Sequence, residues 1–278
     1  MTKSEFRYAH HPKDVKHYTT GELREHFLIP ALFEEDTIKL VYTMYDRYIV
    51  GGVLPVNKPL VLETIDELKA DYFLERRELG IVNVGGKGKV TVDGVVYELN
   101  KKEALYVGKG SKEVIFERAD GEQPNFYINS APAHHTYPTK KVGKDDAEVI
   151  ELGDHKTANR RTLNKLIVNS IVPTCQLQMG LTELHEGNVW NTMPAHSHTR
   201  RMEAYFYFDL AEGQTISHFM GQPHETRHIF MQGHQAVISP EWSIHSGCGT
   251  SNYSFIWGMA GENLDYGDMD GVPTDGLR

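Results

Sequence analysis

Four residues in the second half of the chain have the types and spacing of a metal site. His196 and His198 are separated by one residue, Glu203 follows five positions later, and His245 lies much further along. Side chains at positions i and i+2 of a β-strand point to the same face, so both imidazoles can meet one ion. Three imidazoles and a carboxylate suit zinc, iron, manganese or nickel, and open coordination positions would make the ion catalytic. The sequence therefore predicts one divalent metal ion at these residues.

The combination of these residues carries the prediction, because the chain has 15 histidines and one His-x-His pair would be weak evidence. We interpret the adjacent pairs His10-His11 and His134-His135 as surface or loop residues. The pair at 196 and 198 differs because a carboxylate follows it and a late histidine stands behind the proline turn at Pro240. This favours a metal site over structural histidines.

The elements that must position these residues are predicted to be short β-strands. Alternating, β-branched and aromatic runs broken by Gly, Asn and Pro are typical of strands. They are KVTVDGVVYEL (89–99), ALYVG (104–108), EVIF (113–116), AYFYF (204–208), RHIFM (227–231), AVIS (236–239) and YSFIWGM (253–259). Helical signals are few: a capping-box pattern at Thr19 and Glu22, and a short helix expected near 66–70. Such strands, at a spacing of roughly 8–12 residues, indicate a sandwich or barrel.

The two halves of the chain share a pattern. In each, an apolar strand (ALYVG, AVISP) leads through a short turn into another strand, and the turn ends at Lys112 in the first copy and at His245 in the second. We therefore expect an all-β fold of two barrels, an N-terminal one at 1–150 and a C-terminal one at 151–278, of which only the second holds metal. The charged stretch 140–161 would join them.

Composition limits the partners. The net charge of −9 argues against nucleic acid and against an anionic membrane surface, since both reward a basic protein. No run approaches the roughly 18 apolar residues needed to span a bilayer, and the first residues lack the apolar stretch of a secretory signal. Cys175 and Cys248 have no CxxC spacing, so neither a disulfide framework nor a thiolate site is indicated. We expect a cytoplasmic protein with no membrane partner.

Two runs around the four residues resemble the cupin motifs: GNVWNTMPAHSHTRRME (187–203) and SPEWSIHSG (239–247). The gap from Gly187 to His196 is longer than usual, and Trp242 replaces an inner glycine of the second motif. The ligand set is nevertheless complete. The resemblance implies a bicupin with two jelly-roll-type barrels, in which the N-terminal barrel, with no His-x-His near 75–78, has lost its metal.

Longer runs resemble the 4-deoxy-L-threo-5-hexosulose-uronate ketol-isomerase (5-keto-4-deoxyuronate isomerase) family. They are DRYIVGG (46–52), YFLERRELG (72–80), APAHHTYPTKK (131–141), NRRTLNK (159–165), WNTMPAHSHTRRMEAYFYF (190–208), MGQPHETRHI (220–229) and SPEWSIHSGCGTSNYSFIWGM (239–259). The resemblance implies isomerisation of 5-dehydro-4-deoxy-D-glucuronate to 3-deoxy-D-glycero-2,5-hexodiulosonate in pectin and polyuronate breakdown. It also favours Zn²⁺ and suggests a homohexamer.

Such an aldose–ketose isomerisation needs a base. A proton leaves a hydroxyl-bearing carbon next to an aldehyde, a divalent ion polarises the carbonyl, and a base carries the proton from C2 to C1. The candidates for the base are Glu183, Glu225 and His228, and a metal-bound Glu203 could also serve.

The substrate also carries a carboxylate, which an arginine can grip with two hydrogen bonds. The cations near the motifs are Arg161, Lys165, Arg200, Arg201 and Arg227. If the His-x-His strand continues, Arg200 points inward with the ligands and Arg201 outward. Tyr205 and Tyr207 either line the cavity or pack in the barrel, and the tryptophans are expected in the core or at an interface.

Three other functions stay open. A sibling isomerase of inositol breakdown acts on 5-deoxyglucuronate with similar ligands, and side-by-side assays of the two sugars would separate them. A metal-dependent oxygenase or oxalate-type oxidase would need dioxygen. A non-catalytic sugar-binding or regulatory cupin would bind without turnover, and the acidic charge gives no DNA-binding footprint.

Overall fold

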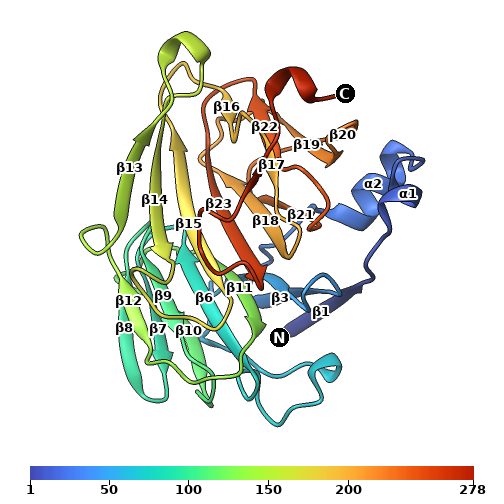
Figure 1. Ribbon diagram of the computed structural model, residues 1–278. Helices are drawn as coiled ribbons and strands as arrows, with labels where there is room; N and C mark the ends of the chain where they lie inside the picture. The colour runs from blue at the N-terminus through green and yellow to red at the C-terminus, as the bar shows by residue number, and fades with distance from the viewer. The chain divides into compact units, whose positions relative to one another are not determined.

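The computed structural model describes all 278 residues, which form two compact units built mainly of strands (Figure 1). The all-β fold that the sequence predicts is therefore confirmed. Unit 1 comprises Met1–Arg7, Ala31–Ala147 and Leu166–Met179, and unit 2 comprises Tyr8–Pro30, Glu148–Lys165 and Gly180–Arg278. The units thus differ from the consecutive halves 1–150 and 151–278, because residues 8–30 belong with the C-terminal strands and residues 166–179 with the N-terminal ones.

Unit 1 has two sheets. One has the strand order β1-β3-β4-β11-β6-β9-β12 and the other β5-β10-β7-β8. The bounds are β1 Thr2–Arg7, β3 Thr37–Thr43, β4 Ile49–Leu54, β5 Leu60–Val61, the 3-10 turn Asp66–Leu68, β6 Arg77–Asn83, β7 Gly88–Val92, β8 Val95–Leu99, β9 Ala104–Val107, β10 Val114–Arg118, β11 Phe126–Pro132 and β12 Lys140–Val142. Asp93 and Gly94 join β7 to β8 with φ angles of 46° and 83°, the positive values that a two-residue hairpin turn requires.

The interior of unit 1 is apolar. Leu79, Ile81, Phe116 and Ile128 are among the buried side chains of one continuous core. The buried carboxylate of Glu78 is fully used by the chain itself. It accepts hydrogen bonds from the backbone N–H groups of residues 175, 176 and 177 at 2.8–2.9 Å and from the hydroxyl of Tyr106 at 2.8 Å. No group of three or more His, Cys, Asp or Glu side chains lies close enough in unit 1 to hold a metal ion.

Unit 2 also has two larger sheets, ordered β13-β14-β15-β23-β18-β21-β2 and β16-β22-β19-β20, and the short pair β17-β24. The bounds are α1 Pro12–Val15, α2 Thr20–Phe27, β2 Leu28–Ile29, β13 Glu148–Leu152, the 3-10 turn His155–Thr157, β14 Arg161–Ile167, β15 Gln178–Leu184, β16 Trp190–Asn191, β17 His196–Ser197, β18 Arg201–Phe208, β19 Ile216–Gln222, β20 Glu225–Met231, β21 Gln235–Ser239, β22 Ser246–Gly249, β23 Ser254–Gly261, β24 Asp270–Gly271 and the 3-10 turn Thr274–Gly276. No helix is long and apolar enough to cross a membrane.

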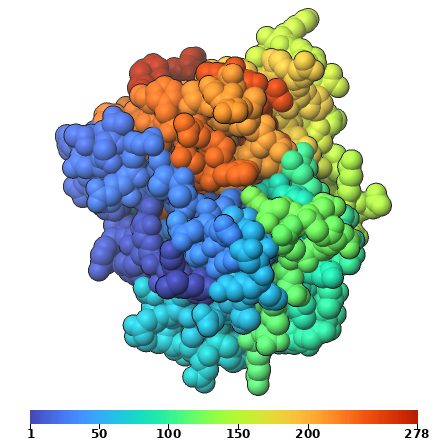
Figure 2. All heavy atoms as spheres, turned by 180° about the vertical axis from the view of Figure 1, so that it is seen from behind, coloured from blue at the N-terminus to red at the C-terminus, as the bar shows by residue number.

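The N-terminal helices belong to unit 2 because they pack on its strands. The capping box predicted at Thr19 and Glu22 is confirmed, and it begins α2. Arg24 of α2 donates a hydrogen bond to the carbonyl of Phe230 on β20 at 2.7 Å, and β2 pairs with β21. In Figure 2 the blue helical residues lie against the orange residues of these strands.

Strand β18 is an interior strand of the larger sheet of unit 2. It pairs with β21 on one side and β23 on the other, and all eight of its residues are buried. Strand β15 lies next to β23 and approaches it closely because Gly180 has no side chain: a Cβ there would lie 2.0 Å from the ring of Trp257 on β23. Because successive side chains of a strand point to opposite faces of the sheet, alternate residues of β18 face the barrel interior.

We predict that Glu78→Gln lowers the free energy of unfolding by roughly 2–4 kcal/mol, because an amide nitrogen would face backbone N–H donors that need acceptors. Urea unfolding followed by circular dichroism measures the change. The control is Glu75→Gln, whose half-buried carboxylate accepts one backbone N–H, from Asp71. We expect that change to stay below about 1 kcal/mol. Equal midpoints for the two variants would contradict a structural role of Glu78.

Candidate functional site

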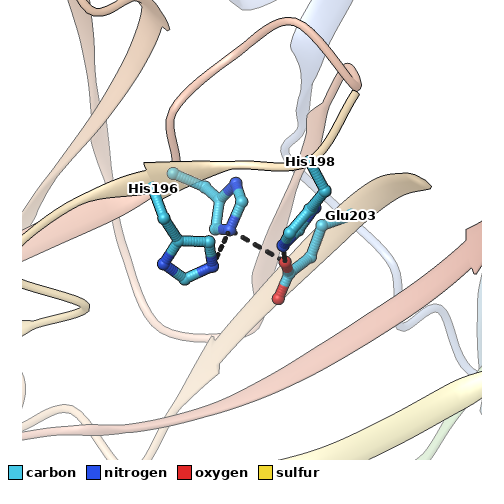
Figure 3. Close-up of side chains that lie close together, drawn as sticks. His196, His198 and Glu203 are labelled. Atoms are coloured by element: carbon cyan, nitrogen blue, oxygen red, sulfur yellow. Dashed lines mark hydrogen bonds and ion pairs between the residues drawn. The ribbon is translucent and has the colours of Figure 1, made fainter. Parts of the chain in front are cut away.

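The four predicted ligands meet in unit 2, and three of them, His196, His198 and Glu203, line a cavity of about 350 Å³. One ligand atom from each of His196, His198, Glu203 and His245 lies within 4.8 Å of all the others. Figure 3 shows the side chains of His196, His198 and Glu203 pointing toward one another. Three separate parts of the chain thus bring their side chains to one point, as the sequence predicts.

The distances in this cluster fit a divalent ion. His245 Nε2 lies 3.0 Å from His196 Nε2 and 2.9 Å from Glu203 Oε2, and His198 Nε2 lies 3.4 Å from the same oxygen. Ligands at about 2.0–2.2 Å from a tetrahedral zinc ion lie roughly 3.4 Å from one another. His198 Nε2 and Glu203 Oε2 are buried without a hydrogen-bond partner, which is costly unless a cation completes the site. The donor set therefore fits zinc or a similar ion.

Local structure orients each ligand. His196 lies on β17, and His198 follows it just before the turn into β18. The Nδ1 of His198 lies 3.2 Å from the carbonyl oxygen of Arg201, which can accept a hydrogen bond from the Nδ1–H and leave Nε2 free to face the cluster. The turn that carries His245 is held by the N–H of Gly221, which donates to Ser243 Oγ at 2.9 Å.

Burial sets the protonation of the cluster. It lowers the pKa of His196, His198 and His245 to about 3. The charge of Arg201 adds to the effect at all three, and neighbouring histidines add to it at His196 and His198. Burial raises the pKa of Glu203, which the surrounding histidines oppose. The imidazoles are therefore neutral at neutral pH, which is the form that binds metal ions.

Two of the predicted substrate-binding residues line the same cavity. Arg161 on β14 is half-buried and donates one hydrogen bond, to the carbonyl of Asn159 at 2.8 Å. Tyr205 on β18 is buried, and its hydroxyl lies 2.8 Å from that of Thr192. Tyr207, two positions further, instead packs behind the cavity with its hydroxyl 2.8 Å from Nδ1 of the buried His218.

Arg200 and Arg201 have the reverse of the orientation expected from a continuous strand. The side chain of Arg200 is 65% exposed and pairs with Glu262, whereas Arg201 is 1% exposed and lines the cavity. The reason is that β17 ends at Ser197 and a turn precedes β18, so the two-residue alternation does not pass through it.

Five other candidates do not line the cavity. Lys165 donates to Glu148 at 2.8 Å. Glu183 follows the cavity-lining Thr182 on β15 and lies 3.4 Å from the amide of Asn164. The remaining three, Glu225, Arg227 and His228, lie on β20, where Glu225 and Arg227 form an ion pair of 3.0 Å and His228 is exposed. The structure thus does not bring these five side chains to the cluster.

Sequence patterns miss part of the cavity wall. Tyr266 and Met269 come from the irregular segment after β23, which has no strand or helix period. Trp257, expected in the core or at an interface, is buried and also lines the cavity. The long run YSFIWGM marks a strand, but no local signal tells which of its residues face a cavity.

An all-β unit in which three histidines and a glutamate that could hold a metal ion meet at one buried point has a cupin-like architecture. Solved structures support this fold. An IolB-like protein from Salmonella typhimurium has a TM-score of 0.69 at 12% identity and covers 88% of this chain and 96% of its own. An oxalate decarboxylase from Lactobacillus farciminis has a TM-score of 0.56 at 10% identity and covers 81% and 79%. At these identities the likeness shows the fold alone.

Sequence comparison then gives the family. The model of the KduI/IolB family matches residues 27–270. Proteins named 4-deoxy-L-threo-5-hexosulose-uronate ketol-isomerase are 64% identical in Formosa agariphila (100% of this chain and 99% of the relative) and 54% identical in Escherichia coli (98% and 99%). The chain belongs to the KduI/IolB family. The resemblance to the ketol-isomerases is thereby confirmed, and the chain is an enzyme of the ketol-isomerase class.

We predict that the chelated protein takes up one Zn²⁺ per chain and that His245→Ala weakens this binding at least about 100-fold, because one of four ligands is lost. Competition with a chromogenic chelator measures the affinity. The control is His224→Ala, which removes an exposed imidazole on the turn between β19 and β20. Equal affinity in both variants would exclude the cluster as the binding site.

Proposed function

We propose that the chain is a metal-dependent aldose–ketose isomerase that converts 5-dehydro-4-deoxy-D-glucuronate to 3-deoxy-D-glycero-2,5-hexodiulosonate in pectin and polyuronate degradation. The main observation behind the proposal is the sequence identity to relatives named ketol-isomerase, 64% over 278 residues and 57% over 270 residues. The cluster of three histidines and one glutamate beside a cavity with an arginine supports it. We further propose a cytoplasmic homohexamer, on the resemblance alone.

The metal proposal is one Zn²⁺ held by His196, His198, Glu203 and His245. When bound, such an ion supplies Lewis-acid polarisation of the substrate carbonyl. The protein contributes neutral imidazoles, an orientation of His198 fixed through the carbonyl of Arg201, and an enclosed cavity in which charges interact more strongly than in water.

We propose Arg161 as the residue that binds the substrate carboxylate. The cavity lining holds two arginines, and Nη1 and Nη2 of Arg201 already donate to backbone carbonyls. Arg161 makes one hydrogen bond, to Asn159, and its remaining N–H groups can form the two-point contact that a carboxylate needs. Tyr205 is proposed to present its hydroxyl beside the cluster, since burial keeps its pKa well above the usual value and the group protonated.

Glu203 is proposed as the base that moves the proton between C2 and C1. It is the one carboxylate among the side chains that line the cavity. The other candidates, Glu183, Glu225 and His228, would require substrate to reach the far face of β15 or the outer strand β20.

The test is an NMR assay in deuterated water with freshly made 5-dehydro-4-deoxy-D-glucuronate. We expect a ketose product that carries deuterium at C1 or C2, and we expect its formation to stop on chelation and to resume with added Zn²⁺. In Glu203→Gln we expect turnover to fall by at least about 1,000-fold even at saturating Zn²⁺, since both a ligand and the base are changed.

If excess metal restored the activity of Glu203→Gln, Glu203 would act as a metal ligand and not as the base. If the wild-type protein forms no ketose, the proposed function fails for this sugar. Turnover of 5-deoxyglucuronate instead would favour the sibling activity, which the family description KduI/IolB also includes.

A second prediction concerns Arg161. We expect Arg161→Met to raise KM by roughly 100-fold with a smaller effect on kcat, because a carboxylate contact contributes to binding in both the ground and transition states. The matched control is Arg160→Met, which changes the exposed neighbour on the same strand end and should alter KM less than about twofold. Equal KM values for both variants would exclude Arg161 as the residue that binds the substrate carboxylate.

A further inference from the structure

One wall of the cavity belongs to neither of the large sheets of unit 2. Residues 262–272, here called the wall segment, follow β23 and return to the metal-ligand strand. Within it, β24 pairs with β17, so that Gly271 lies opposite His196, and the N–H of Val272 donates to the carbonyl of Ala195 at 2.9 Å. Tyr266 and Met269 of this segment line the cavity.

The middle of the wall segment is irregular, and one side chain organises it. Arg201 donates from Nη1 to the carbonyls of Asn263 and Asp265, both at 3.0 Å, and from Nη2 to that of Asp268 at 3.1 Å. A fourth, longer contact of 3.5 Å reaches the carbonyl of Tyr266. The planar guanidinium thus fixes the directions of several peptide groups at once, which a single ammonium group cannot do.

Arg201 is also the residue that connects this wall to the ligands. It begins β18 two positions before Glu203, and its own carbonyl lies 3.2 Å from Nδ1 of His198. Its charge is buried without a carboxylate ion pair, and carbonyl dipoles surround it instead. Such burial of a charge is tolerated only where these contacts persist, so Arg201 holds the wall segment against the start of β18.

Tyr266 is placed by this arrangement. Its ring centroid lies 5.2 Å from that of Trp257, and Lys165 Nζ lies 4.8 Å from the centroid. Burial raises the pKa of Tyr266 to about 12, so its hydroxyl remains a hydrogen-bond donor at neutral pH. That hydroxyl makes no hydrogen bond within the chain, although the residue lines the cavity.

We propose that Arg201 is a positioning residue that holds residues 263–268 against the cavity, so that the hydroxyl of Tyr266 contacts the substrate and limits which sugar acids fit. The proposal rests on the proposed isomerase function for the identity of the substrate. The clamping of the wall segment by Arg201 is independent of that function.

The first test is hydrogen–deuterium exchange of the full zinc-loaded chain. In Arg201→Met we expect amides 268, 269 and 272, which donate backbone hydrogen bonds in the present structure, to exchange at least about tenfold faster, while β18 and β23 keep their wild-type rates. Arg201→Lys should give an intermediate result, and it serves if the Met variant does not fold.

The matched control for exchange is Arg77→Met. Arg77 is the buried arginine of unit 1 that likewise donates to backbone carbonyls, those of Arg47 and Ser130. Its loss tests the general effect of removing a buried arginine, and the wall segment should not respond. Unchanged exchange of residues 262–272 in both Arg201 variants would overturn the clamp, as would equal acceleration throughout unit 2.

The second test is a double-mutant cycle on KM. We expect Arg201→Met and Tyr266→Phe each to raise KM about tenfold, with kcat reduced less than about threefold and zinc affinity unchanged. If Arg201 acts through Tyr266, the double variant should be no worse than the more impaired single one. Multiplicative effects, or a lowered zinc affinity in Arg201→Met, would overturn the positioning role.

The two proposals fail in distinguishable ways. Absence of turnover by the wild-type protein would exclude the proposed isomerase function. The exchange experiment would then still test whether Arg201 holds the wall segment. Faster exchange of the wall segment with an unchanged KM in Tyr266→Phe would keep the clamp and overturn the substrate contact of Tyr266.

Discussion

Three imidazoles and a carboxylate must lie together inside a barrel, and this requirement shapes most of unit 2. A buried polar group without a partner costs roughly 1–3 kcal/mol. Such a cluster is therefore favourable only if the atoms of each side chain that face away from the cluster find hydrogen-bond partners and a cation binds the atoms that face into it. The anchors are visible for His198, through the carbonyl of Arg201, and for the turn of His245, through Gly221 and Ser243. The interior position of β18 then fixes Glu203 between the two strands with which it pairs, β21 and β23.

Unit 1 also has two sheets, but no cluster of metal-binding side chains lies inside it. Its interior is filled by aliphatic and aromatic side chains, and the buried carboxylate of Glu78 is satisfied by three backbone N–H groups and Tyr106. A carboxylate used in this way is a structural group, since it has no free lone pair directed at an empty space. The chemistry proposed for the chain therefore belongs to unit 2, and we propose that unit 1 has a structural role.

The sequence predicts the clustering of the four side chains because residue type and spacing suffice for it. His-x-His and a following Glu are close in the chain, and strand alternation holds along β18 from Glu203 to Tyr205. The same rule is wrong for Arg200 and Arg201, because a turn interrupts the alternation between β17 and β18. It gives no guidance for Glu183 either, since both faces of β15 are buried and the apolar pattern cannot show which face meets the cavity. Strand periodicity cannot predict the conformation of the wall segment, because that conformation depends on hydrogen bonds from Arg201, about 60 positions earlier in the chain.

The charges of the cavity explain why a sugar acid suits it better than a neutral sugar. Of the two arginines in the lining, Arg201 is surrounded by carbonyl dipoles, whereas Arg161 has N–H groups left to donate. A divalent ion bound by three neutral imidazoles and one carboxylate would retain a net positive charge, so both the cluster and Arg161 would attract an anion. A substrate that engaged both would need an oxygen-rich end at the cluster and a carboxylate at the other end. The spacing between the cluster and Arg161 would then select for substrate length, while the aromatic lining from Tyr205, Trp257 and Tyr266 would exclude water from the reacting carbons.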